Sequence, residues 1–259
     1  MKRTIVFSAL AIGIFAGCKG PMPKSTQPGV YKITKVTLSG GGKDSVYART
    51  QMKIYTDNAF AYASLASDSS VGFGIGYYRS DSANRITETN VYNSRVLDSA
   101  ATYNLSITSK DSVYTQVLPI KGTSGKMYQM TEVYNKLPAD GTSKIDGVWK
   151  LDKAYIVKGN DTTKLSEIQY KAFWGGHFMF VHRYPADNTN TKFKNGFGYG
   201  DFTLRNDTLS ETENLTSHPT LMGHTFAIKI TFKDEDEYSQ IITDTKTGEQ
   251  SVEIYRKFK

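Results

Sequence analysis

Two glutamates occupy matching places in the two halves of the chain, and each has threonine or serine on both sides. They are Glu88 and Glu211. Because side chains alternate along a β-strand, each glutamate would face away from its two hydroxyl neighbours. An inward carboxylate would be a polar contact for a ligand, whereas an outward one would form a cross-strand ion pair with Lys53 or Lys171. The residues alone leave both interpretations open.

Aromatic side chains alternate in the same matched segments. They are Tyr55, Phe60 and Tyr62 in the first half, and Phe173, Phe178 and Phe180 in the second. The spacing places each trio on one face of a hairpin, where it would fill a core or line a cavity. Ligand pockets are mostly apolar with a few polar groups, and the 17 tyrosines add hydroxyls to such a lining. We predict that these six aromatics, together with the two glutamates, contact a ligand.

The four histidines all lie in the second half, at positions 177, 182, 218 and 224. His177 and His182 are five residues apart, so they face opposite sides of a single strand. A metal site needs three or four converging ligands, and no spacing here provides them. We therefore expect neither a metal nor another cofactor.

Serine-hydrolase, zinc-protease and nucleotide-loop motifs are absent, which favours a protein that is not an enzyme. Two carboxylates that meet only in space would leave no such motif.

These residues belong to an internal repeat. Segment 29–33 (GVYKI) recurs as 147–151 (GVWKL), and segment 132–134 (EVY) recurs as 253–255 (EIY). Between them, the alternating glycines of 72–76 (GFGIG) match those of 196–200 (GFGYG). A phosphate-binding loop would need a helix directly after it, and strand-like residues follow instead. The glycines therefore predict close backbone approach within a sheet.

Each copy divides into eight strand-like runs separated by turn residues, and no run shows a long 3.6-residue stripe. In the first copy the runs start near residues 29, 45, 59, 71, 84, 100, 112 and 126. Eight short antiparallel strands suit a barrel, because closure removes exposed strand edges. We predict an all-β protein of two tandem eight-stranded antiparallel up-and-down barrels. The first repeat covers 29–137, a linker 138–146, and the second repeat 147–259.

The first strand of each copy carries a Gly-x-aromatic motif, at Tyr31 and Trp149. This motif resembles the opening motif of the lipocalin-like (calycin) barrels. The resemblance implies that the aromatic ring closes one end of the barrel, and that a basic residue near the last strand packs across the ring. Arg256 would be that residue in the second copy, and Asn135 holds the matched position in the first. The resemblance also implies that a small ligand binds inside the barrel.

The N-terminal segment predicts export. Lys2 and Arg3 precede an apolar run over 5–15 that is shorter than the roughly 20 residues of a membrane-spanning helix. Residues 1–17 are therefore predicted to be a cleaved signal peptide. Segment 15–18 (FAGC) resembles a bacterial lipobox, which implies that Cys18, the only cysteine, becomes the lipidated first residue. Residues 18–28 would then be a tether, and Lys19 after the cysteine implies the outer membrane, with the protein facing the periplasm.

The net charge gives little indication of a partner. Loss of Lys2 and Arg3 lowers the formal net charge from +7 to +5, and the remaining basic residues are scattered. Nucleic-acid binding needs a clustered basic face, so we expect no nucleic-acid partner. Taken together, the residues predict an envelope lipoprotein that carries or scavenges a small apolar or amphipathic ligand in a barrel cavity. Its membrane contact would be the lipid anchor, and its oligomeric state is left open.

An interaction module that binds a glycan or an envelope protein through its loops or outer surface is the alternative. This alternative requires exposed aromatics, for which Tyr77, Tyr78, Tyr92 and Trp174 are the candidates.

Overall fold

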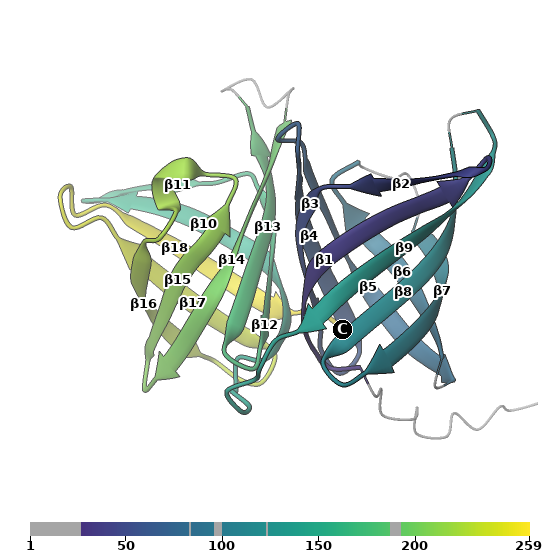
Figure 1. Ribbon diagram of the computed structural model, residues 1–259. Coiled ribbons are helices and arrows are strands. Elements are labelled where there is room, and N and C mark those ends of the chain that lie inside the picture. The colour runs from purple at the N-terminus through teal and green to yellow at the C-terminus, as the bar shows by residue number, and fades with distance from the viewer. Residues whose placement is uncertain (1–26, 83, 96–99, 123, 187–192) are drawn as a thin grey trace, which may run out of the picture.

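The computed structural model describes residues 27–82, 84–95, 100–122, 124–186 and 193–259. Figure 1 shows two β-barrels side by side. The first contains β1 (Gly29–Gly40), β2 (Lys43–Tyr47), β3 (Arg49–Tyr55), β4 (Ala59–Ala66), β5 (Val71–Ser82), β6 (Arg85–Asn93), β7 (Ala101–Lys110), β8 (Val113–Lys121) and β9 (Met127–Lys136). The second contains β10 (Gly147–Lys158), β11 (Asp161–Lys164), β12 (Ile168–Trp174), β13 (His177–Pro185), β14 (Phe193–Arg205), β15 (Thr208–Thr216), β16 (Thr225–Phe232), β17 (Glu237–Thr243) and β18 (Gln250–Lys257). The only helix among the described residues is the short 3₁₀ turn η1 (Pro219–Leu221).

Each barrel is an up-and-down meander closed by its first and last strands. β1 pairs with β9, and β10 pairs with β18, both antiparallel. β2 and β3 both pair with β1, but β2 pairs with its C-terminal half and β3 with its N-terminal residues. The two therefore form one interrupted strand, as β11 and β12 do along β10. Two closed eight-stranded antiparallel barrels result, and the predicted fold is confirmed.

The glycine stripes permit close backbone approach. A Cβ atom on Gly76 would lie 1.9 Å from the carbonyl oxygen of Thr89, and one on Gly200 would lie 1.8 Å from that of Thr212. A β-bulge occurs at each place, immediately before the glycine on its own strand. Because the obstacle is backbone in both barrels, no larger residue fits these positions without moving the neighbouring strand.

The aromatic residue of the opening motif closes one end of each barrel, here named the closed end. Tyr31 and Trp149 are buried, and the Trp149 indole Nε1 donates a hydrogen bond to the carbonyl oxygen of Ile145 at 2.7 Å. The basic residue across the ring is a lysine. Lys136 Nζ lies 5.8 Å from the centroid of the Tyr31 ring, and Lys257 Nζ lies 5.0 Å from that of Trp149.

This arrangement corrects the expectation for Arg256. The Arg256 guanidinium instead forms exposed ion pairs with Asp152 and Glu237. Since side chains alternate along β18, Arg256 and Lys257 face opposite sides of the strand, and only Lys257 faces the ring. The pairing residue is thus one position further along, and both copies have it.

The barrels share an apolar wall made by the outer faces of β3–β5 and β12–β14. Small residues of β4, Ala59, Ala61 and Ala63, are almost fully buried there and belong to one cluster with residues of the second barrel. At the closed ends Tyr77 stacks on Phe258, with ring centroids 4.5 Å apart. At the other ends, here named the mouths, the Asn195 side chain donates to the carbonyl oxygen of Ser94 at 2.9 Å. Both mouths therefore lie at the same end of the molecule.

The four aromatics that the alternative function requires on the surface do not form an exposed cluster. Tyr78 is buried inside the first barrel. Tyr77 stacks at the junction of the barrels, and Tyr92 and Trp174 pack against the shared wall. The predicted signal peptide and Cys18 lie outside the described residues. Within the described ranges, no helix is long and apolar enough to cross a membrane.

Candidate functional site

The matched glutamates face into the barrels and are nonetheless ion-paired. Glu88 and Glu211 are buried, with 5% and 3% of their surfaces exposed. Lys53 Nζ lies 2.5 Å from a Glu88 oxygen, and Lys171 Nζ lies 2.8 Å from a Glu211 oxygen. The sequence left open whether each glutamate faces inward or forms a cross-strand ion pair. Each does both, because the ion pair lies inside the barrel. Because the pair is buried, removal of either partner would leave an uncompensated charge inside the barrel and destabilise the fold.

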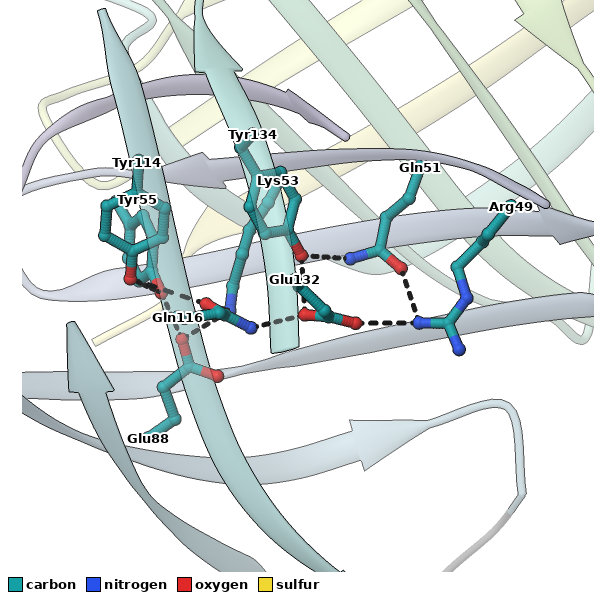
Figure 2. Close-up of polar contacts among 9 residues, drawn as sticks. All are labelled: Arg49, Gln51, Lys53, Tyr55, Glu88, Tyr114, Gln116, Glu132 and Tyr134. Carbon is teal, nitrogen blue, oxygen red and sulfur yellow. Dashed lines mark hydrogen bonds and ion pairs between the residues drawn. The ribbon is translucent and has the colours of Figure 1, made fainter. Parts of the chain in front are cut away.

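In the first barrel a continuous polar network extends from this pair to the mouth (Figure 2). Glu132 is its second acid, and it accepts hydrogen bonds from Arg49 at 2.7 Å, Gln116 at 2.5 Å and Tyr134 at 2.8 Å. Gln116 also accepts a hydrogen bond from Lys53 at 3.1 Å, which joins the two acids. Both carboxylates are thereby supplied with donors, as buried charges require.

The second barrel repeats this network residue for residue at six positions. Its members are Gln169, Lys171, Glu211, Gln240, Glu253 and Tyr255, which match Gln51, Lys53, Glu88, Gln116, Glu132 and Tyr134. Glu253 accepts hydrogen bonds from Gln240 at 2.8 Å and Tyr255 at 2.5 Å, as Glu132 does from its partners. The common set is therefore a shared feature of the two barrel interiors.

All six predicted ligand-contacting aromatics point into the barrels. Tyr55 and Phe60 belong to the interior cluster of the first barrel with Tyr62 packed against them, and Phe173, Phe178 and Phe180 belong to that of the second. The Tyr55 hydroxyl donates to Glu88, and burial together with that carboxylate raises its pKa well above the usual value. The ring therefore stays a neutral hydrogen-bond donor. Contact between these residues and a ligand stays a prediction.

The barrels differ where Tyr55 is replaced by Phe173. In the first barrel the hydroxyl of Tyr114 lies 3.3 Å from that of Tyr55 and 3.4 Å from Gln116. Tyr238 matches Tyr114, but Phe173 offers it no hydroxyl. The buried Tyr238 oxygen consequently has no hydrogen-bond partner among the described residues.

A second difference is Glu213, which stands where the first barrel has Asn90. With the Asn90 side-chain amide turned so that both of its polar atoms are satisfied, its nitrogen donates to the carbonyl oxygens of Tyr92 and Ile75, at 2.8 and 2.9 Å. Glu213 is only 3% exposed, and its Oε2 has no hydrogen-bond partner in the described part of the chain. Burial, reinforced by the nearby Glu211 carboxylate, raises the pKa of Glu213 to about 7. A carboxyl that is half ionised near neutrality is thus held inside the second barrel.

The third difference lies at the mouth. Arg49 of the first barrel is matched by Glu167, so the sign of the charge is reversed. Glu167 lies 3.7 Å from His182 Nδ1. His182 Nε2 lies 2.9 Å from His218 Nε2, so one ring donates to the other. Burial and the adjacent His182 lower the pKa of His218, which favours the neutral form of the His218 ring. The Tyr184 ring packs on His182, with centroids 4.7 Å apart.

Glu213 and the histidine pair lie on the same inner face. A Cβ atom on Gly196 would meet both imidazoles, and one on Gly198 would meet Glu213 Oε2 and the Phe180 ring. Residues two apart on a strand share a face and are separated by about 7 Å. The Glu213 carboxyl therefore lies about 7 Å further from the mouth than the two imidazoles. Among the described residues, no group of three or more acidic, histidine or cysteine side chains is arranged to hold a metal ion.

Two hollows lie in the outer surface of the second barrel. One is at its closed end, beside Asp236 and Arg256. The other has a volume of about 200 Å³ and opens where β11 gives way to β12. Its lining is Leu151, Asp152, Lys153, Ala154, Lys164, Leu165, Ser166 and Glu167. It reaches Glu167 and the buried Leu151 and Ala154, so it marks a gap in the wall next to the mouth.

Sequence reasoning missed the convergence of His182 and His218, because 36 residues separate them and both were considered only for metal binding. It also missed Glu213, although the repeat contains a signal: an acid in one copy stands where the other has an amide.

His177 has a different role, with Asp201 at 2.7 Å on one ring nitrogen and the carbonyl oxygen of Pro138 at 2.9 Å on the other. It connects the linker to the second barrel.

Comparison with known proteins assigns no family. No family model and no curated protein matches the chain. Among solved structures it is similar to a protein of unknown function from the DUF3598 family, from Nostoc punctiforme. The two are 8% identical, the match covers 89% of this chain and 96% of the other, and the TM-score is 0.26. A similarity this weak carries no argument about function, so the candidate site depends on its own geometry.

Proposed function

We propose that this protein is an envelope lipoprotein, anchored through Cys18, that binds a small amphipathic ligand at the mouth of its second barrel. The observation that carries the proposal is Glu213, a buried carboxyl whose Oε2 has no hydrogen-bond partner among the described residues. Buried polar groups are normally satisfied, and exceptions occur at functional sites. A ligand with a donor group would supply the missing hydrogen bond, and the Phe180 ring beside Glu213 would contact its apolar part.

The first barrel serves mainly to support the second in this proposal. Its two interior carboxylates, Glu88 and Glu132, both have donors, and its mouth is bridged by the Arg49–Glu132 ion pair. The shared wall then holds the second barrel against a fixed neighbour.

Ligand binding is tested by native mass spectrometry of the full-length protein purified from membranes. We expect wild type to retain a small molecule that is lost in Gly196→Val, since the added side chain would collide with the imidazoles of His182 and His218 and displace them. Gly72→Val is the matched control, because it changes the corresponding strand of the first barrel. Circular dichroism checks that both variants fold. Absence of any bound molecule from wild type, or its equal loss from both variants, would contradict the proposal.

Anchoring is tested separately. Cys18→Ser removes the only thiol, and we expect the protein to move from the membrane fraction to the soluble fraction and to lose incorporation of labelled palmitate. Retention of Cys18→Ser in the membrane would rule out this anchor.

A further inference from the structure

The two barrels differ in how their interior charges balance. Apart from the closed-end lysines, the inward-facing charged residues of the first barrel's network are two cations and two carboxylates, namely Arg49, Lys53, Glu88 and Glu132. In the second barrel the buried cation is Lys171, and the carboxyls are Glu167, Glu211, Glu213 and Glu253, of which Glu167 faces His182. Lys194, opposite Tyr184 on the same face, is exposed at the mouth, so the carboxyls still outnumber the cations. A low-dielectric interior strongly disfavours uncompensated charge. The second barrel therefore lacks positive charge that the first barrel has.

Lys171 cannot provide the missing compensation. Its ammonium donates to both oxygens of Glu211 at 2.8 and 2.9 Å, and to Gln240 at 3.3 Å. An ammonium has three donor positions, so this set occupies all of them. Glu213 Oε2 is left with no donor among the described residues.

The surroundings of Glu213 also have the chemistry that recognises an organic cation. Phe180 lies beside its carboxyl. His182 packs edge-on against Phe180 toward the mouth, and Tyr184 packs against His182. Aromatic faces attract cations, most strongly when water is excluded. The Glu167 carboxylate, which also faces His182 Nδ1 at 3.7 Å, lies at the edge of the gap in the wall, where an incoming cation would first meet it.

From this charge deficit, and resting on the ligand site proposed above, we infer that the ligand of the second barrel is an organic ammonium ion. Its N–H groups donate to Glu213, its charge offsets the excess of carboxyls, and its carbon body packs on Phe180 and Tyr184. The first barrel, with Asn90 in place of Glu213 and Arg49 in place of Glu167, does not take this ligand.

The test is isothermal titration of the full chain with three probes of equal length: hexylammonium, hexanol and hexanoate. We expect hexylammonium to bind at least about tenfold more tightly than the other two, as one charge-assisted hydrogen bond implies. Glu213→Gln should reduce the hexylammonium affinity by about 10–100-fold. Glu235→Gln, which removes an exposed acid, should leave it unchanged. The melting temperature of each variant confirms folding.

The outcomes separate this inference from the proposed function. Binding of hexanol or hexanoate as tightly as hexylammonium, lost in Gly196→Val, would overturn the ammonium inference and leave a ligand site in place. Unchanged hexylammonium affinity in Glu213→Gln would also overturn it. If none of the three probes binds and no molecule is retained on purification, both the inference and the proposed function fail.

Discussion

The first barrel encloses an interior in which every carboxylate has a cation or donor, whereas the second encloses the same network with extra acids and fewer partners. Six polar positions are identical, so the fold itself needs them. The changes are concentrated between the network and the mouth, where Arg49 becomes Glu167 and Asn90 becomes Glu213. After a duplication, what both copies retain indicates the requirements of the scaffold. Where one copy departs at a cost in stability, the departure indicates a function.

The largest expected effect is on the lysine that both networks share. Lys171→Met would leave Glu211 buried without its cation, and we expect a loss of about 3–5 kcal/mol in the free energy of unfolding. Urea denaturation followed by tyrosine fluorescence measures it. Lys53→Met is the matched change in the first barrel. Because the second barrel already has excess carboxyls, Lys171→Met should cost more than Lys53→Met at neutral pH. An equal or smaller loss for Lys171→Met would show that the difference in interior charge between the barrels does not affect their stability.

The next effect concerns Glu213 and depends on pH. The folded-state pKa of about 7 lies above the usual value of 4.5, so between these values the unfolded chain ionises while the folded protein stays protonated. Wild-type stability therefore falls as the pH rises through this window, by about 3 kcal/mol. Glu213→Gln should be more stable than wild type by that amount at about pH 8, and the difference should vanish near pH 4. Urea midpoints over this range test it, and a difference independent of pH would contradict the assignment.

A smaller effect should follow from giving the second barrel the residue of the first. Phe173→Tyr would place a hydroxyl near Glu211 and Tyr238, as Tyr55 places one near Glu88 and Tyr114. We expect a gain of about 1 kcal/mol, because the orphaned Tyr238 hydroxyl acquires a partner. Thermal unfolding measures it. The reverse change, Tyr55→Phe, should destabilise the protein, and a gain in both variants would show that packing, not hydrogen bonding, governs this position.

The smallest effect is expected at the closed ends. Lys257→Met and Lys136→Met each remove a cation from an aromatic face, at Trp149 and Tyr31 respectively. We expect losses of about 0.5–1 kcal/mol, and a larger loss for Lys257 because tryptophan is the better partner. Melting temperatures of the two variants compare them directly. Arg256→Met is the control for a nearby exposed cation, and it should have less effect than Lys257→Met.

Much of the fold was predictable because it depends on patterns within single strands. Alternation and turn residues locate the eight runs of each copy, and the Gly-x-aromatic motif locates Tyr31 and Trp149. The lysine across each ring was misplaced by one residue, since only the register between β18 and β10 determines which side chain of the last strand faces inward. The shared wall was not predicted at all. Its strands are buried on both faces, and the alternate alanines of β4 reflect that second contact.

The site was less predictable for a related reason. The repeat identified Glu88 and Glu211. A strand pattern does not say which of its two faces is the inside of a barrel, so it could not show that their partners Lys53 and Lys171 lie inside. His182 and His218 come together only because β13 and the segment after β15 both border β14. A systematic search for positions where the repeat changes charge would have identified Glu213.

The position of the two closed ends has a consequence for how the molecule would sit at a bilayer. The chain enters the first barrel at Gly29, beside the ring of Tyr31 and therefore at a closed end. If Cys18 carries the anchor, ten residues separate it from Gly29, and such a segment spans at most about 35 Å. The closed ends would face the lipid and both mouths would face the aqueous compartment. A ligand would then arrive by diffusion through water, not by lateral transfer out of the membrane, which selects for molecules that are themselves water-soluble.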